Sequence, residues 1–323
     1  MVPYARMWLA MILLATGAAI AQAQPAYPTK SIRIIVPYPP GGGSDGLARI
    51  IGQKLSEAVG QQVVIDNRPG AGANIGADLT AKSPPDGYTL LLANVAHAIN
   101  LSYYPKLSYD LLKDFTPVAL LAETSIILVV HPSLPVKTVK ELIALAKARP
   151  GQIDYASSGA GGPNHMAGEL FAYMAGVKMM HIPYSGGGTA AIALIGGQVP
   201  VGFPVTTSAA SQVKAGKLRA LGISSKQRSA LFPDLPTISE AGLPGYEASV
   251  WYGLLAPAGT PTEIATRLHA ETVNLMKLPD TKSRLDGGGY DPAVSTPEQL
   301  GAHLRSEVEK WKKVVNALGL RAN

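Results

Sequence analysis

The feature that most constrains this chain is a β-branched apolar run that enters a glycine-rich turn and leaves it as an amphipathic helix. Residues 34–45 read Ile-Ile-Val-Pro-Tyr-Pro-Pro-Gly-Gly-Gly-Ser-Asp, and apolar side chains then recur at helical spacing up to Val59. The pattern predicts a strand over 32–37 and a helix over 43–59, with Ser44 or Asp45 as its cap. Backbone N–H groups converge at such a turn, so it is a candidate anion-binding site.

Short β-branched runs and helical patterns alternate along the rest of the chain, which is typical of parallel βαβ units. Two more glycine turns have the same strand–turn–helix form, at 158–165 and 185–189. The segment 94–100, which contains Asn94 and His97, also follows an expected strand. In open parallel sheets the ligand crevice lies at the carboxyl ends of the strands, so these segments are candidates for a binding site.

The expected elements follow from this periodicity. Further strands are expected over 62–67, 88–93, 118–121, 126–130, 153–157, 179–184, 199–203, 218–223 and 250–257. Further helices are expected over 74–82, 139–148, 163–174, 208–215 and 262–276, after the turn at 185–189, and over a long segment ending near 318. The last helix has a capping box, because Thr296 and Gln299 have the Thr-x-x-Gln spacing.

Two apolar stretches, 127–132 and 253–257, read alike and each precedes a helical pattern. If both are strands that pass between two sheets, the middle of the chain forms one domain and its two ends form the other. We therefore expect one α/β domain from 24–126 plus 251–323 and a second from 127–250. A two-strand hinge of this kind suits closure around a ligand.

The first 23 residues have the pattern of a secretory signal peptide. Arg6 precedes a nearly apolar run over 8–21, and Ala21-Gln22-Ala23 is a small-x-small cleavage site. The run is short for a membrane span. We expect the mature chain to reside in the periplasm.

Composition narrows the classes of function. The chain has no cysteine, which excludes disulfides, a lipoprotein anchor and thiolate chemistry. The net charge is +6, but lysines and arginines are scattered and no basic run is interleaved with aromatic residues, so nucleic acid is not an expected partner. A modest positive field that draws in anionic ligands is the better interpretation.

The sequence lacks the motifs of several common kinds of binding and catalytic site. The turn at 39–45 is not followed by Gly-Lys-Ser/Thr, and Gly-x-Gly-x-x-Gly spacing is missing, so phosphate-loop and dinucleotide sites are not predicted. The histidines show no metal-ligand spacing, although His165 lies beside a glycine turn. No Gly-x-Ser-x-Gly elbow is present, so Ser157, Ser158 and Ser185 are possible hydroxyl donors to a ligand and not expected nucleophiles. We expect no catalytic residue, cofactor or metal.

Ordered motifs along the mature chain resemble the Bug family, the TctC-like substrate-binding proteins of tripartite tricarboxylate transporters. The matching stretches are 27–33, 36–45, 67–72, 85–91, 158–165, 181–184, 214–221 and 255–261, which begin with Tyr-Pro-Thr-Lys-Ser-Ile-Arg and end with Leu-Ala-Pro-Ala-Gly-Thr-Pro. The resemblance implies a periplasmic binding protein-like fold of type II, a Venus flytrap with two α/β domains and a ligand cleft between them.

The resemblance also implies a site. A carboxylate would be held at Pro39–Asp45, and the opposing grip would come from Ser158–Gly162 in the middle domain. Asp45 would repel a carboxylate if it faced the ligand, and it is equally suited to capping the helix. The candidate ligand-binding residues are Tyr38, Pro39, Pro40, Gly41, Gly42, Gly43, Ser44, Asp45, Asn94, His97, Ser158, Gly159, Ala160, Gly161, Gly162, His165, Pro204 and Thr206.

One position departs from the family. Many relatives carry an acidic residue after the strand that ends at Phe203, where this chain has Pro204. Proline cannot pair with a ligand ammonium, so we expect a plain mono- or dicarboxylate, aliphatic or aromatic. The expected function is a monomeric receptor that passes a small organic acid to a small and a large membrane-embedded transporter subunit. A periplasmic enzyme acting on a carboxylated substrate, and a receptor that feeds a membrane sensor, remain as alternatives.

Overall fold

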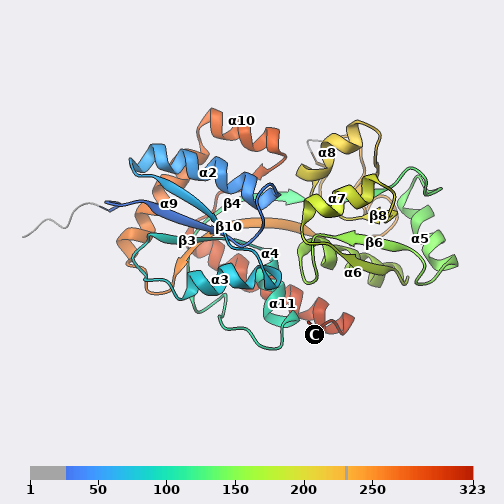
Figure 1. Cartoon of the computed structure of the whole chain (residues 1–323), viewed down its shortest axis with the longest axis horizontal. Helices are drawn as coiled ribbons and strands as arrows, with labels where there is room; N and C mark the ends of the chain where they lie inside the picture. Colours follow the sequence, from blue (N-terminus) through green and yellow to red (C-terminus); the bar gives the residue numbers. More distant parts are fainter. Residues whose placement is uncertain (1–26, 230–231, 323) are drawn as a thin grey trace, which may run out of the picture.

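The computed structural model describes residues 27–229 and 232–322, and the predicted signal peptide over 1–23 lies outside this range. The described chain forms two halves side by side along the long axis, each built on one sheet with helices on its faces (Figure 1). Within the described ranges, no helix has the length and apolar character needed to cross a membrane.

The first half is built on a six-stranded sheet in the order β11-β4-β10-β3-β1-β2. Its strands β1, β2 and β3 are parallel, whereas β10 runs antiparallel to both β3 and β4. Their bounds are β1 Ile32–Val36, β2 Val63–Asn67, β3 Thr89–Asn94, β4 Phe115–Ser125, β10 Ser249–Pro257 and β11 Asp291–Pro292. Strand β3 is buried along its whole length, as expected of a strand covered on both faces.

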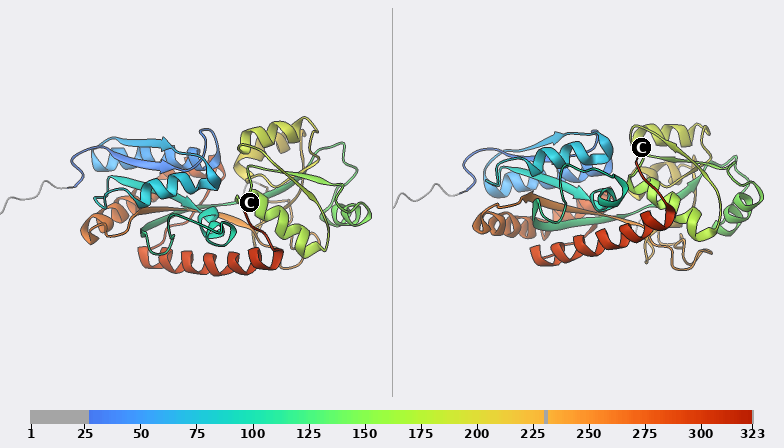
Figure 2. Two further views of the ribbon diagram at one scale, coloured as in Figure 1. Left: turned by 60° about the horizontal axis from the view of Figure 1, so that its bottom comes forward. Right: turned by 90° about the horizontal axis from the view of Figure 1, so that it is seen from below.

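Helices flank this sheet on both faces (Figures 1 and 2). They are α2 Gly43–Val59, the short 3₁₀ helix Ala71–Ala73, α3 Asn74–Ala81, α4 Val95–Tyr103, α9 Thr262–Met276, α10 Pro279–Gly288 and α11 Pro297–Leu318. The predicted capping box of α11 is confirmed, because Thr296 accepts from the Gln299 N–H and Gln299 accepts from the Thr296 N–H. The predicted cap of α2 is wrong: its N-cap is Gly42, and no side chain caps it.

The second half is built on a five-stranded sheet in the order β7-β6-β8-β5-β9. Strand β6 is parallel to β7 and β8, whereas β5 is antiparallel to β8 and β9. The elements are β5 Ile127–Val130, α5 Val139–Ala148, β6 Asp154–Ser157, α6 Pro163–Ala175, β7 Met180–Pro183, α7 Gly187–Ile195, β8 Val201–Gly202, α8 Thr206–Lys214 and β9 Arg219–Ile223. Pro163 occupies the first turn of α6, as the sequence predicts.

The chain passes between the two sheets at two places. Strands β4 and β5 are separated only by Ile126, and residues 224–248 join β9 to β10. The passages are tied together, since the Ile126 N–H donates to Ser224 Oγ at 2.8 Å and the Ser224 N–H donates to the Ile126 carbonyl at 2.8 Å. We propose these passages as the hinge between domains 24–126 plus 251–323 and 127–250. Helix α11 runs along the first half and reaches α6 of the second (Figure 2).

Candidate functional site

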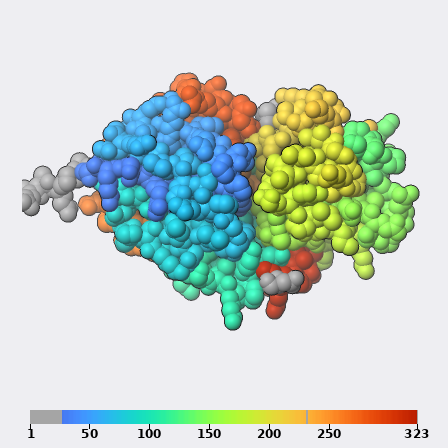
Figure 3. Space-filling model, in the orientation of Figure 1, coloured from blue at the N-terminus to red at the C-terminus, as the bar shows by residue number. Residues whose placement is uncertain are grey.

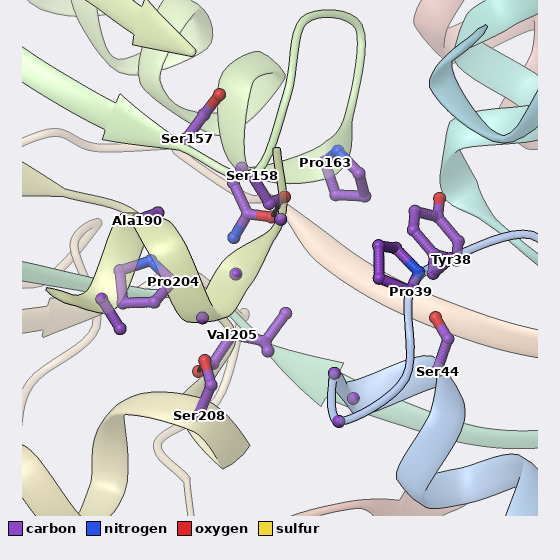
Figure 4. A pocket seen from close by; sticks show the side chains of 18 of the residues that line it. Tyr38, Pro39, Ser44, Ser157, Ser158, Pro163, Ala190, Pro204, Val205 and Ser208 are labelled. Atoms are coloured by element: carbon purple, nitrogen blue, oxygen red, sulfur yellow. Dashed lines mark hydrogen bonds between the residues drawn. The ribbon is translucent and has the colours of Figure 1, made fainter. Parts of the chain in front are cut away.

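A cavity of about 570 Å³ lies where the two halves face each other. The halves meet along a seam in the space-filling view (Figure 3), and the close view shows the turn after β1 opposite turns of the second half (Figure 4). The wall consists of residues 38–44, 94, 156–158, 163–164, 185–191, 204–205, 208, 250 and 252. The cavity therefore combines segments that lie far apart in the sequence.

Ten of the candidate residues from the sequence lie in this wall. They are Tyr38, Pro39, Pro40, Gly41, Gly42, Gly43, Ser44, Asn94, Ser158 and Pro204. The structure does not bring the other eight into the wall: Asp45, His97, Gly159, Ala160, Gly161, Gly162, His165 and Thr206.

The N-terminus of α2 forms one side of the cavity. Gly41 has φ +85°, in the left-handed region that favours glycine, and Gly42 is extended with φ −88°. The first N–H groups of a helix have no intrahelical acceptor, and here no side chain caps them. Tyr290 donates to the Gly43 carbonyl at 2.6 Å, and a Cβ on Gly43 would lie 3.2 Å from the Tyr252 hydroxyl. The turn is therefore fixed from behind and leaves little space for a side chain at Gly43.

Asp45 is buried beneath this turn. Its carboxylate accepts from the Gly41 N–H at 2.9 Å, from Arg49 Nε at 2.9 Å and Nη2 at 3.0 Å, and from Asn67 Nδ2 at 3.0 Å. Burial raises the pKa of Asp45, but the hydrogen bonds from Arg49, Gly41 and Asn67 outweigh burial and hold the pKa below its usual range. This negative charge is neutralised within the first half.

The N-terminus of α7 forms the opposite side. Its N-cap is Gly186, again without a side-chain cap, and a Cβ on Gly186 would lie 3.8 Å from Pro39 Cγ of the first turn. Gly187 and Gly188 have open space around them. The sequence shows 185–189 as a third copy of the strand–turn–helix pattern, but nothing in that pattern indicates that this turn, and not 159–162, faces Pro39.

The turn Ser158–Gly162 contributes only its first residue to the wall. Ser158 Oγ donates to Asn164 Oδ1 at 2.6 Å, and Asn164 Nδ2 donates to the Phe203 carbonyl at 2.5 Å. Further along the turn, Gly161 packs against Tyr103 of α4, where a Cβ would lie 2.8 Å from the ring. The tip of this turn thus contacts the first half beside the cavity.

Two histidines, His165 buried and His181 half-buried, lie behind the same turn. The rings of His165 and His181 stack with centroids 3.9 Å apart, His165 Nδ1 accepts from the Gly161 N–H at 3.0 Å, and Ser157 Oγ lies 2.6 Å from His181 Nε2. Burial, and then the neighbouring His181, lower the pKa of His165 to about 3. Burial lowers the pKa of His181 to about 4. The Ser157 hydroxyl points away from the cavity (Figure 4). Because both pKa values are lowered, the two rings are neutral at pH 7, and they support the turn from behind.

His97 has a similar structural role in the first half. It is fully buried, its Nδ1 accepts from the Asn94 N–H at 3.1 Å, and burial lowers its pKa to about 4. Asn94 Oδ1 in turn accepts from the Tyr38 hydroxyl at 3.0 Å and from the Ala96 N–H at 3.0 Å. His97 therefore orients Asn94 at the start of α4, and Asn94 orients Tyr38 in the wall.

The wall carries no full charge. Among the residues that line the cavity there is no Asp, Glu, Lys, Arg or His. The described part of the chain also contains no group of three or more His, Cys, Asp or Glu residues arranged to hold a metal ion. The electrostatic features that remain are helix N-termini, which favour negative charge, and those of α2 and α7 lie on opposite sides of the cavity. Apolar surface comes from Ala190, Val205 and Val250.

Comparisons with known proteins agree with this architecture. The family profile described as "Tripartite tricarboxylate transporter family receptor" matches residues 47–320. The chain is 37% identical over 313 residues to Protein BugT of Bordetella pertussis, covering 96% of each chain. A solved structure of an R. palustris protein with adipate is 37% identical, with a TM-score of 0.87 over 91% of this chain and 99% of that one.

The solved structure of the periplasmic binding protein BugD is 29% identical, with a TM-score of 0.86 over 92% of this chain and all of that one. These likenesses confirm the periplasmic binding protein-like fold and the resemblance to Bug proteins. The proteins it resembles are substrate-binding receptors and not enzymes. The chain belongs to the tripartite tricarboxylate transporter receptor family, TctC.

Proposed function

We propose that this chain is a periplasmic receptor that captures a small organic carboxylate in the cavity between its halves and delivers it to a tripartite tricarboxylate-type transporter. The observation that carries the proposal is the pairing of two uncapped helix N-termini, of α2 and α7, across a wall without charged side chains. Such helix ends bind anions through free N–H groups and the helix dipole.

The magnitudes favour an acid over a neutral ligand. Each helix end contributes about 0.3–1 kcal/mol toward a negative group when exposed and up to ~2 kcal/mol when partly buried. Hydrogen bonds from N–H groups to a carboxylate are about twice as strong as neutral ones. Two such ends on opposite sides suit a dicarboxylate, and the relative with adipate supports a ligand of that kind. A monocarboxylate would use one end.

The rest of the wall favours a ligand that carries no amino group. The wall has no carboxylate to pair with an ammonium, and Pro204 lines it at the position where the family resemblance led us to expect an acidic residue. Several wall hydroxyls already donate within the protein: Tyr38 to Asn94, Ser158 to Asn164, and Ser208 to the Val205 carbonyl. An aliphatic or aromatic body would contact Ala190, Val205 and Val250.

The proposed contact residues are those of both helix starts, Tyr38–Ser44 and Gly186–Thr189, with Asn94, Ser158 and Pro204. The signal-peptide pattern over 1–23 and the family support a periplasmic location. The family also supports integral membrane transporter subunits as partners of a monomeric receptor.

A thermal-shift screen of organic acids tests the proposal. A ligand at 100 times its dissociation constant adds about 2.7 kcal/mol to the free energy of unfolding. We expect amine-free mono- or dicarboxylates, with adipate as the first probe, to raise the melting temperature of the mature protein. The matched amino acids, such as 2-aminoadipate, should raise it less. Stabilisation by sugars or amines alone, with no response to any acid, would contradict the proposal.

A further inference from the structure

The two halves also touch beside the cavity, where the turn Gly159–Gly162 meets helix α4. Gly161 has φ +75°, and a Cβ there would lie 2.8 Å from the Tyr103 ring and 3.6 Å from Asn100 Oδ1. The rings of Tyr103 and His165 meet edge to face with centroids 6.1 Å apart. This contact joins α4 of the first half to the turn that begins with Ser158 of the cavity wall.

The side chain of Asn100 is fixed in one orientation. It is fully buried, and its Nδ2 donates to the Gly72 carbonyl at 2.7 Å and to Asn74 Oδ1 at 2.8 Å. A backbone carbonyl can only accept, so the nitrogen must face Gly72 and the oxygen must face the other way. The amide therefore presents its Oδ1 on the side of Gly161.

Among the described residues, Asn100 Oδ1 is a buried acceptor without a donor. Buried polar atoms in native proteins are nearly always paired, and each exception calls for an explanation. The turn opposite it has a weakly engaged donor: the Gly162 N–H reaches the Gly159 carbonyl at 3.4 Å, whereas the Gly161 N–H is held by His165 at 3.0 Å. The buried acceptor of Asn100 and this donor of the turn lie on facing sides of the contact between the halves.

We propose that Asn100 is a positioning residue for ligand capture, whose Oδ1 accepts a backbone N–H of the Gly159–Gly162 turn when the halves close on a ligand. The bond would link closure to the wall, because the turn continues directly into Ser158 on one side and Pro163 on the other. The inference rests on the proposed carboxylate binding only for the choice of probe.

Calorimetric titration of adipate into the mature protein tests the proposal with Asn100→Ala. The matched control is Tyr109→Phe, which removes the hydrogen bond from Tyr109 to Asn74 Oδ1 at 2.8 Å in the same buried cluster but keeps the Asn100 side chain and its Oδ1. We expect both variants to melt at lower temperature. Only Asn100→Ala should also weaken adipate, by about tenfold, which corresponds to about 1.4 kcal/mol.

Equal dissociation constants for Asn100→Ala and Tyr109→Phe would overturn the proposal. Should Asn100→Ala not fold, the donor is removed instead: Gly162→Pro loses the N–H of the turn, whereas Gly162→Ala keeps it and meets no atom closer than 3.4 Å. Gly162→Pro should weaken adipate by about tenfold and Gly162→Ala should stay within about threefold of the wild-type value, and equal affinities of these two variants would overturn the proposal.

A wild-type protein that binds no acid would count against the proposed function instead. The role of Asn100 is then read from amide hydrogen exchange of residues 159–162 in the ligand-free protein, since closure is sampled without ligand. Faster exchange in Asn100→Ala than in Tyr109→Phe supports the bond, and equal exchange overturns it.

Discussion

The carboxylate of Asp45 accepts a hydrogen bond from the N–H of Gly41 at 2.9 Å, so the acid that follows the wall residue Ser44 is used to shape the glycine turn. Arg49 and Asn67 complete its hydrogen bonds. The turn can therefore offer its remaining N–H groups to an anion without a neighbouring negative charge facing it. This relationship explains how an acidic residue can belong to a site that we propose for carboxylates.

Replacing Asp45 tests this account through stability. We expect Asp45→Asn to lower the free energy of unfolding at pH 7 by about 1–3 kcal/mol, because an amide nitrogen would face the donors of Arg49 or Asn67. The pKa of Asp45 is lowered in the folded protein, so its contribution is present above the unfolded value near 3.8 and is lost as the pH falls below it. Urea unfolding should therefore show a smaller difference between variant and wild type at pH 3 than at pH 7. The exposed Glu309→Gln is the control, and a constant difference across pH would contradict the expectation.

At the N-terminus of α7, Gly187 can be replaced without a steric clash. Gly187 is the first residue of α7 and has open space around it, so proline fits there and removes one free N–H. We expect Gly187→Pro to weaken a dicarboxylate such as adipate by about tenfold. Gly187→Ala keeps the N–H and should bind as the wild type does. If both variants bind adipate equally well by calorimetry, α7 does not contact the ligand.

A charge placed in the wall should change the selectivity. We expect Pro204→Asp to weaken adipate by about tenfold or more, because like charges facing each other across a contact are strongly unfavourable. The affinity for 2-aminoadipate should fall less, since its ammonium can pair with the new carboxylate. Pro204→Asn has the same shape without the charge and serves as the control. The same loss for both ligands would show that Pro204 does not face the body of the ligand.

The buried histidines predict a loss of stability in mild acid. The folded pKa of His97 is about 4 and that of His165 about 3, whereas an unfolded histidine titrates near 6.5. The unfolded state therefore binds more protons below pH 6.5, and stability falls as the pH drops toward the folded values. Each histidine contributes up to about 1.4 kcal/mol per pH unit in that window. Urea unfolding of His97→Gln between pH 7 and 4.5 should have a shallower slope than the wild type, and an equal slope would contradict this.

Much of the fold can be predicted because its elements have strong local boundaries. The helices Gly43–Val59 and Thr262–Met276 agree with prediction to the residue, since a glycine turn and Pro261 mark where each begins. Helix α10 escapes prediction because only Thr281 and Leu285 of it are buried, too few for an apolar stripe. Strand β11 has two exposed residues and no pattern of its own.

The site is only partly predictable for a different reason. The turns at 159–162 and 185–189 follow the neighbouring parallel strands β6 and β7 and read alike. Which of them faces Pro39 depends on how the second sheet is turned toward the first, and that is set by contacts distant in sequence. In the turn at 159–162, Gly161 packs against the Tyr103 ring of the first half. In the turn at 185–189, Gly186 faces Pro39 across the cavity.

The proposed site holds the carboxylate of its ligand on helix N-termini. Calorimetry with the acid that stabilises the protein most in the screen, compared with the neutral amide of the same acid, tests it most directly. We expect the acid to bind at least about 100-fold more tightly than its amide, a difference of about 2.7 kcal/mol. An amide that binds within about twofold of its acid would contradict it.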